Sequence, residues 1–143
     1  MINLEQFLHS FAKVNCDEYS EYIYEFELIT SDLKEWYKVA LDDYERYKSE
    51  QPKEVITLSN WKNDILTGSE KWWIATIPIH FDLHGLSPKE YLIQAIVEEL
   101  QGEPQVVNEV QGFGYEFNRS VSTLDYFFET AKGVYWLSFS IYD

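Results

Sequence analysis

The strongest candidate for a chemical site is the segment 80–84, whose sequence HFDLH alternates polar and apolar residues. In an extended strand His80, Asp82 and His84 would share one face, with about 6.6 Å between successive Cα atoms. Imidazole and carboxylate groups at this spacing could converge on a divalent metal ion. Gly85 follows directly, however, and favours a strand that ends in a turn with solvated polar side chains. We therefore expect no metal site, and keep these three residues as the candidate ligands if one exists.

Elsewhere the sequence has no pattern that is typical of an enzyme. The single cysteine, Cys16, has no neighbouring histidine in the sequence to activate it as a nucleophile. A nucleophile elbow, a phosphate-binding loop, a dinucleotide fingerprint, a zinc-protease motif and an EF-hand loop are all absent. With 25 carboxylates in the chain, pairs such as Glu98-Glu99 arise by chance and do not indicate acid–base catalysis. The sequence therefore predicts a protein that is not an enzyme and needs no cofactor.

The chain is strongly acidic, with 25 Asp and Glu against 11 Lys and Arg and a formal net charge of −14. This charge opposes direct binding to nucleic acid, because phosphate contacts need Lys and Arg, and it opposes binding to anionic lipid. It favours a basic protein partner, attracted over a distance. A lone cysteine forms no intrachain disulfide, the N-terminus has no signal-peptide pattern, and no apolar stretch approaches the about 20 residues of a membrane span. We therefore expect a cytoplasmic protein that does not contact a membrane.

Half of the net charge lies between positions 90 and 129, where eight acidic residues accompany one basic residue, Arg119. The chain is also rich in aromatic residues, with 11 Tyr, 9 Phe and 5 Trp, and tyrosines among acidic residues are typical anchors of protein interfaces. We therefore hypothesise that acidic and tyrosine side chains of this segment form one partner-binding face. Its predicted members are Glu98, Glu99, Glu103, Glu109, Tyr115, Glu116, Asp125, Tyr126 and Glu129. The alternative is that these side chains point to different faces and form no patch.

Helix and strand signals alternate along the chain without a linker or a repeat. The clearest helix start is Ser87-Pro88-Lys89-Glu90, which combines an N-cap, a proline at the first helical position and a capping-box glutamate. Further helices are expected to begin after Asn3, at Asp32, at Ser59 and at Ser122, the last ending at Gly133. Strand-like runs rich in β-branched and aromatic residues lie at 21–29, 72–83, 105–110, 112–121 and 134–142.

These elements predict one α+β domain over residues 1–143, with a mixed, largely antiparallel sheet of about five strands packed against four to five helices. Gln111-Gly112 suits the turn of a hairpin between two of the runs, and Pro78 places the run 72–83 at a sheet edge or a bulge.

In size, charge and aromatic content the chain is similar to the immunity proteins that bacteria make against their own polymorphic nuclease toxins. That resemblance implies a small, non-catalytic inhibitor of a basic partner, either a toxin or a nucleic-acid-binding protein. It transfers no residue roles, because no motif carries it. The alternatives are a small metal-dependent enzyme that uses His80, Asp82 and His84, a nucleic-acid mimic that inhibits a DNA-binding protein, and an acidic accessory domain without an inhibitory role.

Overall fold

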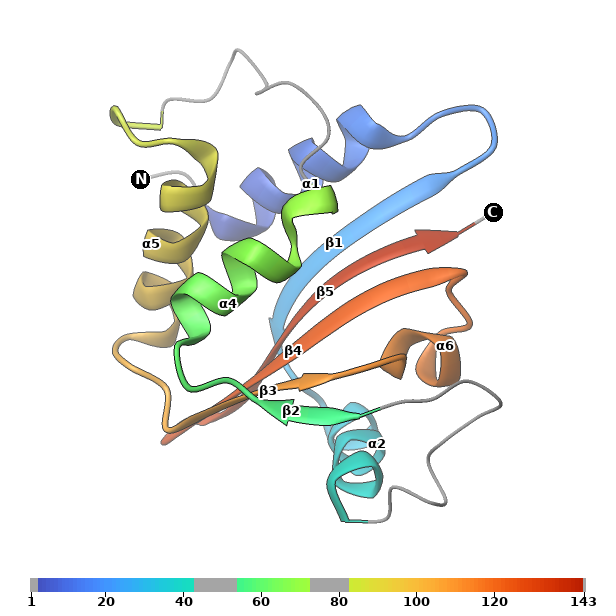
Figure 1. The fold of residues 1–143 in the computed structure, drawn as a ribbon, viewed down its shortest axis with the longest axis vertical. Coiled ribbons are helices and arrows are strands. Elements are labelled where there is room, and N and C mark those ends of the chain that lie inside the picture. Colours follow the sequence, from blue (N-terminus) through green and yellow to red (C-terminus); the bar gives the residue numbers. More distant parts are fainter. Residues whose placement is uncertain (1–2, 43–53, 73–82, 143) are drawn as a thin grey trace.

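Five strands and six helical segments occur in the part of the chain that the computed structural model describes, residues 3–42, 54–72 and 83–142 (Figure 1). In chain order they are α1 (Leu4–Asn15), β1 (Glu21–Leu28), α2 (Ser31–Asp42), β2 (Val55–Thr57), α4 (Trp61–Gly68), the 3₁₀ helix η1 (Glu70–Trp72), α5 (Pro88–Leu100), β3 (Val106–Val110), α6 (Phe113–Phe117), β4 (Ser122–Thr130) and β5 (Gly133–Tyr142). Within these ranges, no helix has the length and apolar character needed to cross a membrane.

The strands form one sheet in the order β1-β5-β4-β3-β2, and every described pair of neighbouring strands is antiparallel. Helices α1, α4 and α5 pack on the face toward the viewer of Figure 1, which we call the front. Helices α2 and α6 pack on the opposite, rear face. The predicted α+β fold is therefore confirmed, with a fully antiparallel sheet in place of a mixed one.

Because both faces of the sheet are covered, the protein has two separate cores. In the front core, aromatic and aliphatic residues of β1, β4 and β5 pack against the three front helices. In the rear core, Tyr37 of α2 stacks on Phe127 of β4 with ring centroids 4.2 Å apart, and Phe113 of α6 packs against Phe127 and Trp136. Strand residues alternate between faces, so β4 places Tyr126 in the front core and the adjacent Phe127 in the rear core.

Two of the predicted helix starts are confirmed by capping hydrogen bonds. The N–H of Glu5 donates to Oδ1 of Asn3 at 2.8 Å, at the start of α1. At the start of α5, the N–H of Glu90 donates to the Ser87 hydroxyl at 3.2 Å, and that hydroxyl donates to the Glu90 carboxylate at 3.0 Å. Helix α5 ends at Leu100, and Gln101 follows it in the left-handed conformation with φ 58°. These caps set the length of α5 on the front of the sheet.

The predicted helix from Ser122 to Gly133 is wrong, because these residues form the strand β4 and its turn into β5. Tyr126, Phe127 and Phe128 are apolar at successive positions because this central strand is buried on both faces, which hides the alternation that identifies a strand. Pairing with β3 and β5 decides the structure of the segment.

The predicted strand 112–121 is also wrong, and with it the hairpin about Gln111-Gly112. Gly112 has a φ of 72°, and the chain then forms the short helix α6. Phe113 and Phe117, four residues apart on this helix, stack on each other and pack on the rear face. Strand β2 was not predicted, since its three residues are too short to show a period. The predicted strand 72–83 falls mainly on residues 73–82, outside the described residues.

Candidate protein-binding surface

Asp125 and Tyr126 were predicted to contact a partner, but they are 1% and 0% exposed and this prediction is wrong. The Asp125 carboxylate accepts hydrogen bonds from the Trp136 indole N–H at 2.9 Å, the Gly114 N–H at 3.1 Å and the Thr123 hydroxyl at 2.5 Å. Burial raises its pKa to about 6, although the hydrogen bonds oppose the shift. The carboxylate therefore connects α6 to the sheet and is shielded from any partner.

Four of the other predicted residues lie on the front of the molecule. Glu98 and Glu99 are exposed on α5, and neither forms an ion pair within the described ranges. Glu103 is exposed too, but its carboxylate lies 2.9 Å from the Lys62 ammonium, and this contact holds its pKa below the ordinary value. Glu109 is half-buried on β3, and burial raises its pKa.

The remaining predicted residues lie at the rear or in α6. Glu129 accepts a hydrogen bond from the Tyr37 hydroxyl at 2.8 Å and so belongs to the contact between α2 and the sheet. Tyr115 is half-buried in α6, and Glu116 belongs to the same helix. The eight predicted residues whose side chains the structure describes are therefore divided between two faces and the interior, and they do not form one surface.

Two of the three candidate metal ligands, His80 and Asp82, lie outside the described residues. His84 is exposed and has a φ of 52°. Among the residues that are described, no group of three or more His, Cys, Asp or Glu side chains is placed to hold a metal ion. The absence of a metal site at 80–84 therefore stays a prediction, with His80, Asp82 and His84 as the candidate ligands if one exists.

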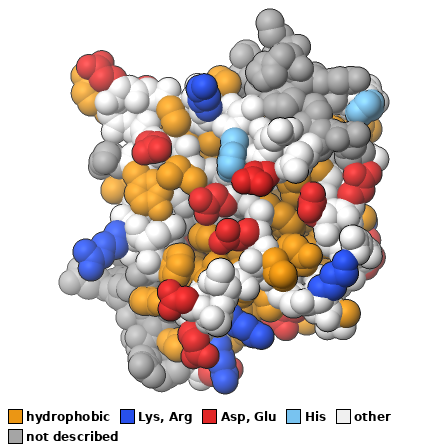
Figure 2. Space-filling model, turned by 180° about the vertical axis from the view of Figure 1, so that it is seen from behind, with side chains coloured by type: hydrophobic (Ala, Val, Ile, Leu, Met, Phe, Trp, Pro, Cys, Tyr) orange, Lys and Arg blue, Asp and Glu red, His pale blue; other side chains and the backbone are white. Residues whose placement is uncertain are grey.

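Acidic side chains gather instead along β1, on the part of the rear face beside the sheet edge. Tyr24 and Phe26 of β1 pack in the front core, so the alternate residues Glu21, Glu25 and Glu27 point to the rear. Figure 2 shows this side of the molecule, with acidic side chains in its middle and hydrophobic side chains around them. Glu21 and Glu27 are exposed and Glu25 is half-buried.

The pKa of Glu25 shows that these carboxylates influence one another. Burial raises this pKa, the nearby carboxylates of Glu27 and Glu5 raise it further, and His9 lowers it. Glu5 lies on α1, where it is 66% exposed and 3.9 Å from His9. We call Glu5, Glu21, Glu25 and Glu27 the acidic face.

A tyrosine of the neighbouring strand borders the acidic face. On β5, Tyr142 is paired with Glu21, and Ser138 is paired with Glu25. Burial raises the pKa of Tyr142, and the carboxylates of Glu25, Asp125 and Glu21 add to the shift. The half-buried ring thus places a neutral phenol and some apolar area beside the carboxylates.

A second tyrosine, Tyr19, lies in the loop that leads into β1, two residues before Glu21. Oδ1 of Asp17 accepts the Tyr19 N–H at 2.8 Å, which orders this loop. The Cys16 sulfur accepts the N–H of Tyr22 at 3.3 Å and ties the loop to the strand. The Tyr19 side chain is nevertheless 77% exposed, so a large ring is available for contact at the end of β1.

The acidic face lies outside the predicted segment 90–129, although the sequence contains a signal for it. The predicted strand 21–29 already separates Glu25 and Glu27 from the aromatic residues by its alternation. Residues 3–28 also hold six acidic residues against one lysine.

The acidic face, Tyr142 and Tyr19 together form a surface suited to contact with a positively charged protein. Comparison of the chain with protein-family models, with curated proteins and with solved structures gave no significant match.

Proposed function

We propose that this protein is a non-catalytic binding protein whose acidic face captures a basic protein partner and blocks its activity. The observation that carries the proposal is the set of four carboxylates, three on the rear of β1 and one on α1, with Tyr142 and Tyr19 at the Glu21 end of β1. Such carboxylates attract Lys and Arg over about 8 Å at physiological salt, which accelerates the first encounter. The two rings then supply the buried area that slows dissociation.

The more specific proposal is an immunity protein that neutralises a nuclease-type toxin in the cytoplasm. A nuclease needs Lys and Arg around its active site to bind phosphates, so its substrate groove offers the charge that the acidic face attracts. A nucleic-acid mimic would instead need a long, regular row of carboxylates, whereas the acidic face is confined to β1 and one residue of α1. No described residue favours the metal-dependent enzyme.

Reversing charge on the acidic face is expected to slow association with the partner. The partner would first be captured from the native host on the immobilised wild-type chain at low salt, eluted at high salt and identified by mass spectrometry. For the double variant Glu21→Lys, Glu27→Lys we expect an association rate about tenfold lower, because long-range attraction controls the encounter. Surface plasmon resonance at several salt concentrations measures this rate and its salt dependence.

The matched control is the double variant Asp32→Lys, Glu35→Lys, which makes the same charge change on exposed residues of α2. Its association rate should be close to that of the wild type, apart from the decrease that follows from the less negative net charge of the whole chain. A third variant, Glu98→Lys and Glu99→Lys, tests the two exposed members of the predicted set that form no ion pair within the described ranges. The proposal fails if the acidic-face variant associates like the α2 control, or if the association rate does not depend on salt.

A further inference from the structure

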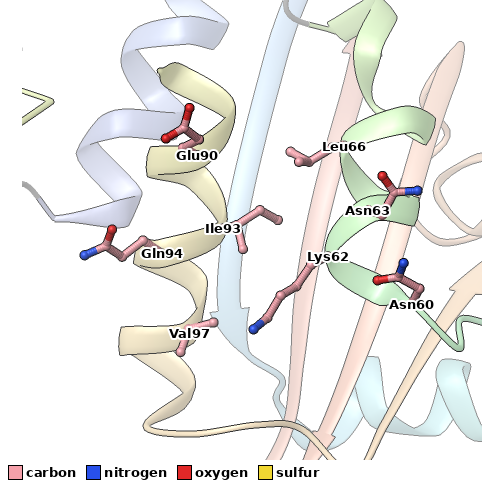
Figure 3. Close-up of a pocket in the computed structure, with 8 residues that line it drawn as sticks. All are labelled: Asn60, Lys62, Asn63, Leu66, Glu90, Ile93, Gln94 and Val97. Atoms are coloured by element: carbon pink, nitrogen blue, oxygen red, sulfur yellow. The ribbon is translucent and has the colours of Figure 1, made fainter. Parts of the chain in front are cut away.

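A groove of about 540 Å³ runs between α4 and α5 on the front of the molecule, opposite the acidic face. Its floor is aliphatic: Figure 3 shows Leu66 pointing from α4, and Ile93 and Val97 pointing from α5, into the space between the helices. All three side chains are only half-buried. The groove therefore exposes several aliphatic side chains next to one another. Single exposed aliphatic residues are common on protein surfaces, whereas a contiguous apolar patch marks a binding site.

The spacing of the aliphatic residues suits a helical occupant. Ile93 and Val97 are four residues apart, so they lie one turn, about 6 Å, apart along α5. An amphipathic helix presents its own apolar side chains at intervals of three and four residues, and such a row packs between two helices.

The charges at the margin of the groove favour a basic occupant. Lys62 of α4 lines the groove, but its ammonium is paired with Glu103 at 2.9 Å; Lys89 lies 3.7 Å from Glu70, so each of these two described lysines has an acidic partner. On α5, Glu90 and Gln94 line the groove, and Glu98 continues the same stripe one turn further. The margin on α5 is thus negative and is not neutralised by the lysines nearby.

We propose that this groove binds a basic amphipathic helix of a protein partner. Leucine, isoleucine or methionine side chains of that helix occupy the aliphatic floor, and lysine or arginine on its flank meets Glu90 and Glu98. This inference goes beyond the proposed function, because the groove lies on the front whereas the β1 carboxylates of the acidic face point to the rear, and the two surfaces need not serve the same partner.

The test uses a fluorescein-labelled helical peptide of about 15 residues, built from leucine and lysine with the leucines on one face. Fluorescence anisotropy with the full chain should give saturable binding. A peptide of the same composition, with leucines distributed around the helix, should bind at least about fivefold more weakly, because it cannot fill the floor. A leucine–glutamate helix should not bind.

Matched substitutions separate the groove from general attraction to an acidic protein. Val97→Thr keeps the volume and adds a hydroxyl in the floor, so it should weaken binding, whereas Val121→Thr makes the same change at an exposed valine elsewhere and should not. Glu98→Lys should likewise weaken binding more than Glu35→Lys. Equal binding of the two leucine–lysine peptides, equal effects within either pair of variants, or no saturable binding would each overturn the proposal. A concentration-dependent dimer that Val97→Thr disrupts would also overturn it, by assigning the groove to a second copy of the chain.

Discussion

Lowering the pH from 7.5 to 5 is expected to stabilise the folded protein, with Asp125 as the principal source of the gain. In the folded state burial raises the pKa of this carboxyl to about 6, from an ordinary value of 3.8. Between these two values the folded state binds a proton that the unfolded state does not bind. The stabilisation is therefore complete below about pH 4 and is lost as the pH rises through about 6.

The rise in the pKa of Asp125 contributes about 3 kcal/mol to the free energy of unfolding below about pH 4, where the carboxyl is protonated in the folded and the unfolded state alike. Of this contribution, about 1 kcal/mol is gained between pH 7.5 and 5. Glu25 and Glu109 act in the same direction, because burial raises the pKa of each. Glu103, whose pKa is lowered, acts in the opposite direction, but it lies at the surface where solvent weakens its contribution.

Urea unfolding at several pH values measures this effect directly. Asp125→Asn carries no titrating proton, so this variant should lose most of the stability gain between pH 7.5 and 5. It should also unfold more easily at every pH, because its amide N–H₂ group faces other donors such as the Trp136 indole N–H. If that variant does not fold, Thr123→Val serves instead: it removes a hydrogen bond that favours the ionised form, so the gain should begin at a higher pH. Loss of stability from pH 7.5 to 5 in the wild type would contradict the prediction, as would a full gain in Asp125→Asn.

Local signals were sufficient to predict the outer elements of the fold, and contacts between distant residues decide the rest. The caps at Asn3 and Ser87 act within one helical turn, and the alternation in the edge strand β1 reflects its unlike faces, so each of these can be found from neighbouring residues. Strand β4 is different, because it becomes a strand through its pairing with β3 and β5 and is buried on both sides. Its run of successive apolar residues is equally compatible with a buried helix.

The same limit explains why the predicted binding residues did not form one surface. Acidic density along the chain does not say which side chains share a face, and Asp125 shows that an acidic residue can be wholly interior when three groups donate hydrogen bonds to it. Glu21 and Glu27 could be placed on one face from alternation alone. The contact of Glu21 with Tyr142 requires the pairing of β1 with β5, across more than 100 residues of sequence.

Replacing Gly114 with alanine is expected to destabilise the protein by about 3 kcal/mol, whereas helix propensity alone would predict that alanine stabilises it. Gly114 lies in α6, where alanine would ordinarily be favoured over glycine by about 1 kcal/mol. Here an added Cβ would lie only 2.2 Å from Oγ1 of Thr123 and 2.7 Å from Oγ of Ser120. The Thr123 hydroxyl is held by the Asp125 carboxylate, which also accepts the Gly114 N–H, so room for the methyl group has to come from breaking these contacts.

Urea unfolding of four variants, Gly114→Ala, Gly85→Ala, Thr123→Ala and the double variant Gly114→Ala/Thr123→Ala, tests this account. Gly85→Ala is the control, since an added Cβ meets no described atom within 4 Å there, and only its φ of 79° should cost about 1 kcal/mol. Combining Gly114→Ala with Thr123→Ala removes the hydroxyl that is in the way, so the double variant should lose less stability than the sum of the two single changes. Gly114→Ala that is as stable as the wild type, or more stable, would mean that α6 packs less closely on β4 than described; the buried hydrogen bonds of Asp125 would then not hold this helix in place.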